Sequence, residues 1–467
     1  MDDAAPVHDY APDVTATRFP DRDEIAAVRE EAGKLEPGVE APEERRLAGR
    51  VLGRREMGKL TFLDLVDRSG RVQLLCPVNR TGEVDVHLGD IVGVTGHATK
   101  SRRGEPSLIV DRLEVLAHIR TPLPDTFHGL TDVEQRYRRR YLDLLMNEET
   151  RRDFVLRARM ITELRRGLDD EGFVEVETPV LQPRYGGAFA RPFETYHNEL
   201  EQTLYLRIAT ELYLKRLIVG GLERVYELGK DFRNEGVSFK HNPEFTMLEW
   251  YEAYADYHDT MDRMERLVRR VAEATLGRTT VRFRGHEIDL SRWRRVKLTE
   301  ALDAEGLWTH DEAELRAGLN ERAVDTSHDR TWAQLVDHAL SHFVEPHLIQ
   351  PTILHDYPVE LSPFARASAE EGIVERFEYY AGGMELGNAF TEINDAEEQA
   401  SRFAMQAAEG AGGNVEAEPG DPDYVEALSY GMPPTGGLGM GIDRLAMLFL
   451  GKDSIRDVIL FPALRTK

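Results

Sequence analysis

The chain has 467 residues, more than a single hydrophobic core usually serves, so two or three domains are expected. Its 84 Asp and Glu against 59 Lys and Arg give a formal net charge of -25, which excludes a surface that binds nucleic acid everywhere by phosphate neutralisation. The single cysteine, Cys76, excludes an intrachain disulfide and a cysteine-rich zinc motif, as is typical of a reducing cytoplasm.

The N-terminus is an acidic, polar run, MDDAAPVHDYAPD, whereas a signal peptide begins with basic residues followed by an apolar run. The longest apolar stretches, such as residues 445–450, are far shorter than the ~20 residues that cross a bilayer. We therefore expect a cytoplasmic protein with no membrane partner.

Residues 1–44 are rich in Asp, Glu, Pro and Ala and contain one predicted helix near residues 23–35. We interpret them as a flexible, poorly anchored extension without a catalytic role. Residues 45–120 hold five short β-rich runs separated by turns, which predicts a small five-stranded β-barrel. An OB-fold, which binds single-stranded nucleic acid, is the first candidate. Another small five-stranded barrel would have the same sequence pattern.

A linker is predicted over residues 121–135, which begin with TPLPDTFHGLTD, and a second domain over residues 136–467. The first helices of this domain carry the densest basic cluster of the chain. One interpretation is a set of solvated helix faces with local acidic partners, and the alternative is contact with an RNA backbone. The cluster consists of Arg136, Arg138, Arg139, Arg140, Arg151, Arg152 and Arg157.

After Gly172, strand-like and helical segments alternate to the C-terminus, so the fold class is α+β. A helix-rich stretch at about residues 299–347 is predicted to be an insertion. The polar, Gly/Pro-rich segment 409–423 is predicted to be a surface loop.

Three histidines near the end of the predicted insertion have a spacing that zinc could use. His338 and His342 are four residues apart on a predicted helix, with His347 nearby. No HExxH sequence is present and the neighbours are apolar, so we interpret these histidines as structural.

Residues 437–451, GLGMGIDRLAMLFLG, form a predicted glycine-rich turn followed by an Asp-Arg pair that opens an apolar helix. Glycines let a backbone approach a ligand closely. The run lacks the GxxxxGK[ST] of a P-loop, and Ile442 takes the last glycine position of GxGxxG. Taken alone, the run is compatible with tight packing or with nucleotide binding of another kind.

A second candidate site follows the strand-like run that begins at Arg224 and ends in Phe232-Arg233-Asn234-Glu235-Gly236. In an extended strand, Arg233 and Glu235 would point to the same face because side chains alternate with period two. A guanidinium suits phosphate, and a carboxylate can accept from an amine. The alternative is a surface ion pair, which leaves the downstream aromatic Phe245 unexplained.

Three ordered segments resemble the motifs of one enzyme family. GFVEVETPVL at residues 172–181 resembles motif 1 of class II aminoacyl-tRNA synthetases, FRNEG with HNPEF downstream resembles motif 2, and GLGMGIDR resembles motif 3. The likeness covers about residues 46–467 and is greatest to the bacterial-type lysyl-tRNA synthetases. It implies an OB-fold that binds the anticodon and a catalytic domain built on a mixed, mainly antiparallel sheet with flanking helices.

The resemblance implies a bent ATP held by motifs 2 and 3. Arg233 would hold the α-phosphate, Phe245 and Arg444 would sandwich the adenine, and Arg444 would also reach the γ-phosphate. Catalysis would be electrostatic, with Arg233 and Arg444 as the catalytic residues. The implied ATP-binding set is Arg233, Glu235, His241, Asn242, Phe245, Glu378, Glu385, Gly441 and Arg444.

Within that set, Glu235 would read the adenine edge and His241 would help to hold the terminal phosphates. Glu378 and Glu385 match the metal-binding carboxylates of the family. Oxygen ligands suit Mg²⁺, and the resemblance implies more than one ion per site. An exposed position is the alternative for either glutamate.

The implied amino-acid pocket is acidic, because a selective site must replace the water around a lysine ammonium. Glu211, Glu392 and Tyr251 match the residues at the ε-ammonium, although Glu211 and Lys215 have the spacing of an ordinary exposed helix salt bridge. Paired carboxylates would repel the aspartate side chain bound by a related synthetase. The implied lysine-binding set is Gly186, Gly187, Glu211, Glu249, Tyr251, Asn388, Phe390 and Glu392.

Two residues depart from the family pattern near this pocket. Phe189 stands where a small residue is usual and Tyr196 where a histidine is common. A bulky Phe189 could narrow the pocket, so preference for a lysine analogue or resistance to an inhibitor resembling lysyl-adenylate is a hypothesis left open.

In the barrel, Phe62 and Gln73 match residues that read the central anticodon base by stacking and hydrogen bonding. Without the resemblance, the apolar neighbours of Phe62 would favour a core position. Arg54 and Arg55 could contact phosphates.

The sequence thus predicts a homodimer, with Pro179 of motif 1 at the subunit interface, that joins L-lysine to tRNA(Lys) with ATP. No DNA partner is expected. One rival hypothesis is a paralogue that makes an aminoacyl-adenylate for amide synthesis, inhibitor resistance or protein modification. The other is a non-catalytic protein that binds or regulates RNA.

Overall fold

The computed structural model describes residues 18–124, 130–362, 364–411 and 420–466. The chain divides into two compact units, residues 1–132 and 133–467, and each is described by itself. Parts of the expected linker (residues 125–129) and of the expected loop 409–423 (residues 412–419) lie outside the described residues.

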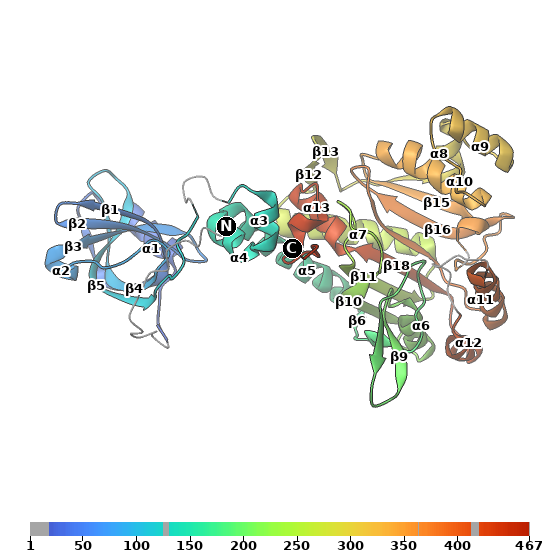
Figure 1. Cartoon of the computed structure of the whole chain (residues 1–467), viewed down its shortest axis with the longest axis horizontal. Helices are drawn as coiled ribbons and strands as arrows, with labels where there is room; N and C mark the ends of the chain where they lie inside the picture. The colour runs from blue at the N-terminus through green and yellow to red at the C-terminus, as the bar shows by residue number, and fades with distance from the viewer. Residues whose placement is uncertain (1–17, 125–129, 363, 412–419, 467) are drawn as a thin grey trace. The chain divides into compact units, whose positions relative to one another are not determined.

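The first unit contains a closed five-stranded barrel with the strand order β1-β2-β3-β5-β4 (Figure 1). Along β2, buried residues alternate with half-buried ones, as expected for strands whose alternate side chains fill the interior. Cys76 is buried in this core. The strands are β1 (Glu40–Met57), β2 (Leu60–Val66), β3 (Arg71–Pro77), β4 (Ile91–Lys100) and β5 (Pro106–Ala117), with a short α2 (Val78–Thr81) after β3.

The segment before residue 45 differs from the expected poorly anchored extension. Helix α1 (Ile25–Gly33) buries Ile25, Val28 and Ala32, which belong to the barrel core. These residues share one helix face, so the helix covers the barrel. Strand β1 already begins at Glu40. Residues 1–17 lie outside the described residues.

The second unit is built on an eight-stranded mixed sheet with the order β14-β15-β16-β17-β18-β11-β10-β6 (Figure 1). The pairs β14–β15 and β10–β6 are parallel and the remaining pairs are antiparallel, which confirms the expected mainly antiparallel sheet. The strands are β6 (Val174–Glu175), β10 (Arg224–Phe232), β11 (Glu244–Ala253), β14 (Arg294–Lys297), β15 (Thr352–Pro358), β16 (Ile373–Tyr380), β17 (Glu385–Thr391) and β18 (Thr435–Gly441).

Helices α5 (Glu148–Asp170), α7 (Tyr257–Leu276) and α13 (Ile442–Leu450) contribute the main core together with the sheet. α7 is amphipathic, begins at a capping box of Asp256 and Asp259, and ends at Gly277 in the left-handed conformation. Its buried face packs in one cluster with Trp250 of β11, which is 0% exposed.

The helix-rich stretch expected to be an insertion is the crossover between the parallel strands β14 and β15. A parallel pair requires such a connection because the chain must return to the same end of the sheet. Figure 1 shows α8, α9 and α10 grouped together, and α8 packs against β15. The crossover consists of α8 (Leu298–Ala304), α9 (Glu312–Glu321), α10 (Trp332–Ala339), a π-helical turn (Leu340–Val344) and a 3₁₀ turn (Glu345–His347).

Smaller elements complete the unit. Two additional sheets have the orders β7-β9-β8 and β12-β13. The remaining elements are β7 (Leu181–Gln182), β8 (Glu194–His197), β9 (Gln202–Leu206), α6 (Glu211–Val219), β12 (Thr280–Phe283), β13 (His286–Asp289), a 3₁₀ turn (Val359–Leu361), α11 (Ala396–Ala411), α12 (Pro422–Ser429) and α14 (Ile455–Val458).

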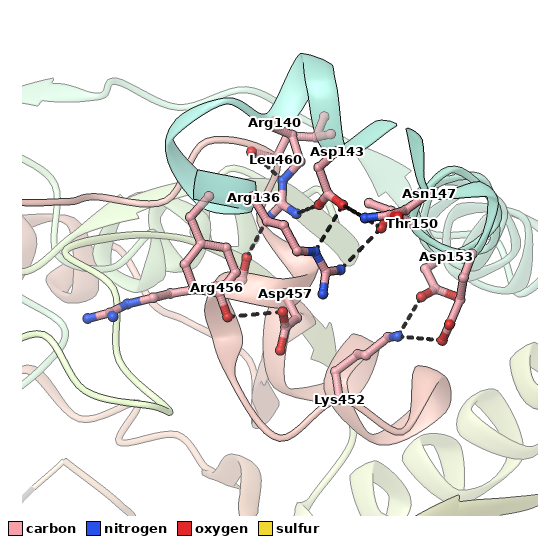
Figure 2. A network of polar contacts seen from close by, with 12 residues as sticks. Arg136, Arg140, Asp143, Asn147, Thr150, Asp153, Lys452, Arg456, Asp457 and Leu460 are labelled. Carbon is pink, nitrogen blue, oxygen red and sulfur yellow. Dashed lines mark hydrogen bonds and ion pairs between the residues drawn. The ribbon is translucent and has the colours of Figure 1, made fainter. Parts of the chain in front are cut away.

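The basic cluster at the start of this unit is largely paired. Figure 2 shows Asp143 of α4 (Arg140–Met146) between Arg140 and Arg136, the latter from α3 (Val133–Arg138). The Asp143 carboxylate accepts from Arg136 Nε at 2.9 Å and from Arg140 Nη1 at 2.5 Å. Arg140 also donates to backbone carbonyls of Arg456 and Leu460, so it fastens the C-terminal segment.

Other arginines of the cluster are paired too: Arg138 binds Glu134 at 2.8 Å, and Arg157 binds Asp443 at 2.6 Å. These contacts favour the interpretation of helix faces with local acidic partners over an RNA-binding surface for the paired arginines.

Replacing Asp143 with Ala should lower the free energy of unfolding of this unit by about 3–5 kcal/mol, because Arg140, 1% exposed, would remain as an unpaired buried cation. Glu134→Ala removes an exposed pair and should cost about 0–1 kcal/mol. All four tryptophans lie between residues 250 and 332, so urea unfolding followed by tryptophan fluorescence reports on this unit alone. Equal losses in the two variants would contradict the anchoring role of Asp143.

Candidate functional site

A cavity of about 450 Å³ lies in the second unit, with walls that include residues of β11, β16, β17 and β18. It brings together residues that are up to about 250 positions apart in the sequence. Gly186 is buried but is not among the lining residues. The predicted site residues that line it are Gly187, Glu211, Arg233, Glu235, His241, Asn242, Phe245, Glu249, Tyr251, Glu378, Glu385, Asn388, Phe390, Glu392, Gly441 and Arg444.

The glycine-rich run expected to be a turn is the strand β18, which pairs with β17 on one side and β11 on the other. Its glycines leave room for side chains of neighbouring strands. A Cβ on Gly437 would lie 2.1 Å from Glu392 Oε1 and 2.5 Å from Tyr251 Cε1, closer than atoms can approach. The absence of a side chain therefore allows two predicted pocket residues to occupy the sheet surface.

One end of the cavity is acidic and buried. Glu211, Glu249 and Glu392 are each at most 6% exposed, and Tyr251 donates to Glu249 Oε2 at 3.1 Å. Gly187, with φ +85°, approaches this end closely, because a Cβ there would lie 2.9 Å from the Glu211 Cβ. Burial raises the pKa of Glu249 and of Glu392 to about 8. A bound cation would relieve this desolvation.

Glu211 and Lys215 do form the helix salt bridge that the sequence allowed, but it is buried rather than exposed. Lys215 is 1% exposed and its Nζ lies 2.6 Å from Glu211 Oε1 and 2.8 Å from Glu392 Oε2. Burial alone would lower the pKa of Lys215, but the two carboxylates raise it well above its ordinary value. Sequence reasoning did not identify Lys215 as part of the site, since only the fold brings Glu392 to it.

Arginines line another part of the cavity, together with Glu235, Glu378 and Glu385. Arg233 lies just after β10, and Glu235 lies farther along the loop between β10 and β11, so strand alternation does not place them. Both nevertheless line the cavity. The Arg233 guanidinium lies 5.1 Å from the centre of the Phe245 ring, a cation–π distance.

Arg444, in the first turn of α13, connects this part of the cavity to β17. Its Nη1 donates to Glu385 Oε2 at 2.9 Å, and its Nη2 lies 3.2 Å from His241 Nε2. Partial desolvation and the neighbouring Arg444 lower the pKa of His241, so its ring is neutral near pH 7. Because Arg444 can only donate, Nε2 accepts, and the proton on Nδ1 points to Ser238 Oγ at 2.8 Å.

Two further contacts fix this region. Asp443 accepts from the backbone N–H of Thr246 at 2.7 Å and so joins α13 to β11. The side-chain amide of Asn242 donates to the Glu244 carbonyl at 2.6 Å and accepts from the Ala463 N–H at 3.1 Å. Asn242 therefore holds the loop in place, which is a more indirect contribution than its expected contact with ATP.

Glu378 and Glu385 lie on the adjacent strands β16 and β17 and both line the cavity. Glu378 accepts from Arg376 at 2.5 Å and from the hydroxyl of Tyr357 at 2.9 Å, and Tyr380 also donates to it. Burial raises the pKa of Glu378, and Glu385 reinforces the shift as a neighbouring negative charge.

Several lining residues carried no recognised sequence signal. Arg376 is two residues from Glu378 on the same strand, so period-two alternation could have identified it. Asp337 and Glu345 come from the crossover that was expected to be an insertion, and only the fold brings them to the cavity. Burial, together with Glu378 and Glu385, raises the pKa of Glu345 to about 7.

The two departures from the family pattern have different surroundings. Phe189 lines the cavity and its ring centre lies 5.1 Å from that of Phe364. Tyr196 is on β8, is 57% exposed and is not a lining residue.

On the barrel, Phe62 of β2 and Gln73 of β3 are half-buried and alternate with buried residues, so both face outward rather than into the core. The register pairs Phe62 with Leu75 and Asp64 with Gln73, which makes Phe62 and Gln73 diagonal neighbours on one face. The Arg55 guanidinium lies 5.7 Å from the Phe62 ring centre, and Arg54 donates to Glu56 at 2.5 Å.

His338 binds Asp329 at 3.0 Å, and His342 Nδ1 lies 3.0 Å from the His338 carbonyl. Among the described residues, no group of three or more His, Cys, Asp or Glu side chains could hold a metal ion. In the same part of the chain, no helix combines the length and apolar character needed to span a bilayer.

Comparison with known proteins agrees with this geometry. Residues 132–465 match the family described as class II tRNA synthetases (D, K and N), and residues 46–116 match the OB-fold nucleic acid binding domain. The chain is 50% identical over 443 residues to a lysine–tRNA ligase of Roseiflexus sp. (strain RS-1), covering 92% of this chain and 91% of the relative.

A lysine–tRNA ligase of Methanoculleus marisnigri is 47% identical over 464 residues, which is 96% of this chain and 91% of the relative. One from Halalkalibacterium halodurans is 47% identical over 433 residues, which is 90% of this chain and 86% of the relative. The chain therefore belongs to the class II tRNA synthetases (D, K and N). This membership accounts for the order of the sheet, the cavity at the glycine-rich strand β18 and the matched OB-fold.

Proposed function

We propose that this chain is a lysine–tRNA ligase, which activates L-lysine with ATP and transfers it to the 3′ end of tRNA(Lys). The observation that carries the proposal is a single cavity that holds a buried carboxylate cluster, formed by Glu211, Glu249 and Glu392, together with the guanidinium groups of Arg233 and Arg444. The first suits an amino acid with two ammonium groups and the second suits a triphosphate. The relatives named lysine–tRNA ligase support the same reaction.

At the acidic end, Glu211 and Glu392 with Tyr251 would receive the ε-ammonium of lysine. Glu249 and Asn388 would contact its α-amino and carboxylate groups, and Phe390 would pack along the aliphatic stem. Buried carboxylates favour a cation and disfavour the anionic side chain of aspartate, which a related synthetase must bind.

In the first step, the lysine α-carboxylate attacks the α-phosphorus of ATP, the bond to the bridging oxygen breaks, and pyrophosphate leaves with the electron pair. Arg233 would hold the α-phosphate and Arg444 the γ-phosphate, with the adenine between Phe245 and Arg444. Charge that develops on the phosphate oxygens is then stabilised by groups already in place. In the second step, a terminal hydroxyl of tRNA attacks the carbonyl carbon and AMP leaves.

The oxygen donors of Glu378 and Glu385 fit Mg²⁺, which binds proteins through one or two carboxylates and shares its other positions with water and phosphates. Burial and, after it, the neighbouring charge of Glu385 raise the pKa of Glu378, and such a cation would offset both. Bound there, Mg²⁺ would neutralise phosphate charge. The residues of this chain would position the phosphates, and Arg376 and Tyr357 would hold Glu378 in its orientation.

The outward face of the barrel that carries Phe62 and Gln73 would read the anticodon, since an aromatic ring and an amide can stack on and hydrogen-bond to an unpaired base. Exposed apolar side chains in motif 1, namely Val174, Val180 and Leu181, support a homodimer interface near Pro179. The single buried cysteine fits a cytoplasmic location.

The first test is ATP–pyrophosphate exchange by the full-length protein. Exchange should depend on L-lysine and should be much weaker with ornithine or aspartate, and tRNA(Lys) should then be charged. Arg233→Ala should reduce kcat roughly 10²–10³-fold, because a preorganised charge at the transition state is lost. Arg270→Ala, on the exposed face of α7, is the matched control and should not change it.

The rival functions give different results in the same assay. Exchange with lysine but no charging of tRNA would favour a paralogue that makes an aminoacyl-adenylate, and preference for a lysine analogue would indicate that Phe189 reshapes the pocket. Absence of exchange with any amino acid would contradict an activating enzyme.

The KM for lysine should rise as the pH falls from about 8 to about 6, a range in which the ε-ammonium of the substrate stays charged. The reason is that burial raises the pKa of Glu249 and of Glu392 to about 8, and their protonated forms bind a cation poorly. Well below these pKa values, the KM should rise roughly tenfold per pH unit for each proton displaced. A lysine KM that is independent of pH would contradict this assignment.

Phe62→Ala should raise the KM for tRNA without changing lysine-dependent exchange, because it removes a stacking contact of about 1–3 kcal/mol on the barrel only. Leu88→Ala, which truncates an exposed apolar side chain elsewhere on this unit, serves as the control. An unchanged KM for tRNA in Phe62→Ala would contradict anticodon binding by this face of the barrel.

A further inference from the structure

Lys215 is a buried cation that the proposed reaction leaves without a role. It lies on α6 one turn after Glu211, is 1% exposed, and its Nζ contacts both Glu211 Oε1 and Glu392 Oε2. The Tyr424 ring of α12 lies 5.3 Å away. Because a buried ammonium is costly unless it is fully paired, a fold that retains it gains something from these two carboxylates.

The cavity lies on the other side of the same carboxylates. Glu211 and Glu392 line it, whereas Lys215 does not. Glu392 Oε2 accepts from Lys215, but Glu392 Oε1 is buried and has no hydrogen-bond partner among the described residues. A buried carboxylate oxygen without a donor is unfavourable, so Oε1 is suited to accept from a ligand.

We propose that Lys215 is a positioning residue for amino-acid specificity, which holds Glu211 and Glu392 from behind so that Glu392 Oε1 faces the substrate ammonium. This inference rests on the proposed lysine–tRNA ligase function. When both carboxylates are ionised, Lys215 and the two glutamates together carry one net negative charge, which one ε-ammonium neutralises. The pocket thus matches the side chain of its substrate in charge as well as in shape.

Without Lys215, two carboxylates would share a buried site with no cation, and one of them would take up a proton because like charges oppose each other's ionisation. The protonated form has lost the charge that attracts the substrate. The groups that face this centre are Glu211 of α6, Glu249 and Tyr251 of β11, Glu392 after β17 and Tyr424 of α12. Each is an acid or a phenol, so no second cation replaces Lys215 among them.

The experiment compares Lys215→Met, which keeps the length of the side chain without its charge, with the wild type in lysine-dependent ATP–pyrophosphate exchange. The KM for lysine should rise about 30-fold or more, since a buried charge pair is broken, while the KM for ATP stays unchanged. The rise in lysine KM on acidification should begin at a higher pH than in the wild type. Lys215→Arg restores the charge and should recover part of the loss.

Lys452→Met is the matched control. Lys452 is half-buried and bridges two carboxylates, Glu149 at 3.0 Å and Asp153 at 2.7 Å, but it does not line the cavity. It should leave the KM for lysine and its pH profile unchanged. Tryptophan fluorescence during urea unfolding checks that each variant is folded. If Lys215→Met does not fold, Lys215→Gln, which keeps a hydrogen-bond donor group, replaces it in the same assay.

The outcomes separate this inference from the function on which it rests. No lysine-dependent exchange by the wild type would overturn the proposed function. Exchange by the wild type with an unchanged lysine KM in folded Lys215→Met or Lys215→Gln would overturn the role of Lys215 alone. That role would also be overturned if the KM values for lysine and ATP rose by the same factor, because a loss of structure would act on both substrates.

Discussion

The row of glycines in β18 is the constraint on which the cavity depends. β18 lies between β17 and β11 at the centre of the sheet, where a strand of ordinary residues would cover both of its neighbours with side chains. Gly437 instead leaves space for Glu392 and Tyr251. On β17, Gly387 also has no room for a side chain, since a Cβ would lie 2.0 Å from the Gly439 carbonyl oxygen. The floor of the cavity is therefore backbone, and its functional groups come from the strands and loops around it.

Several carboxylates of this cavity are paired with buried or half-buried cations. Glu211 and Glu392 are bound to Lys215, Glu385 to Arg444 and Glu378 to Arg376. Buried ions are tolerated only when such partners replace water. The cavity thus offers a carboxylate cluster to a cationic side chain and guanidinium groups to a polyphosphate, which is the combination that joining a cationic amino acid to a polyphosphate requires.

The surrounding scaffold holds these groups by contacts that are distant in sequence. Asp443 fixes the start of α13 to β11, and Arg140 fastens the C-terminal segment to α4 (Figure 2). The crossover between β14 and β15 both completes the sheet and supplies Glu345 to the cavity wall. A segment that resembles an added element in the sequence is thus part of the unit's basic topology.

The sequence by itself determined the outline: a small barrel, an α+β catalytic unit and three motifs whose residue types indicate a nucleotide and a cationic amino acid. These features depend on local pattern and residue chemistry, which a linear sequence records. Residue spacing was a poor guide to element type at the motifs, since residues 437–441 form a strand and Glu235 lies in a loop. Only the tertiary structure decided that Lys215 joins Glu211 to Glu392, because 177 residues separate Lys215 from Glu392 and the packing of α6 against the sheet brings them together. Burial of a charged side chain is a property of the folded chain. The ion pairs that set the charge of the pocket therefore could not be predicted from the sequence.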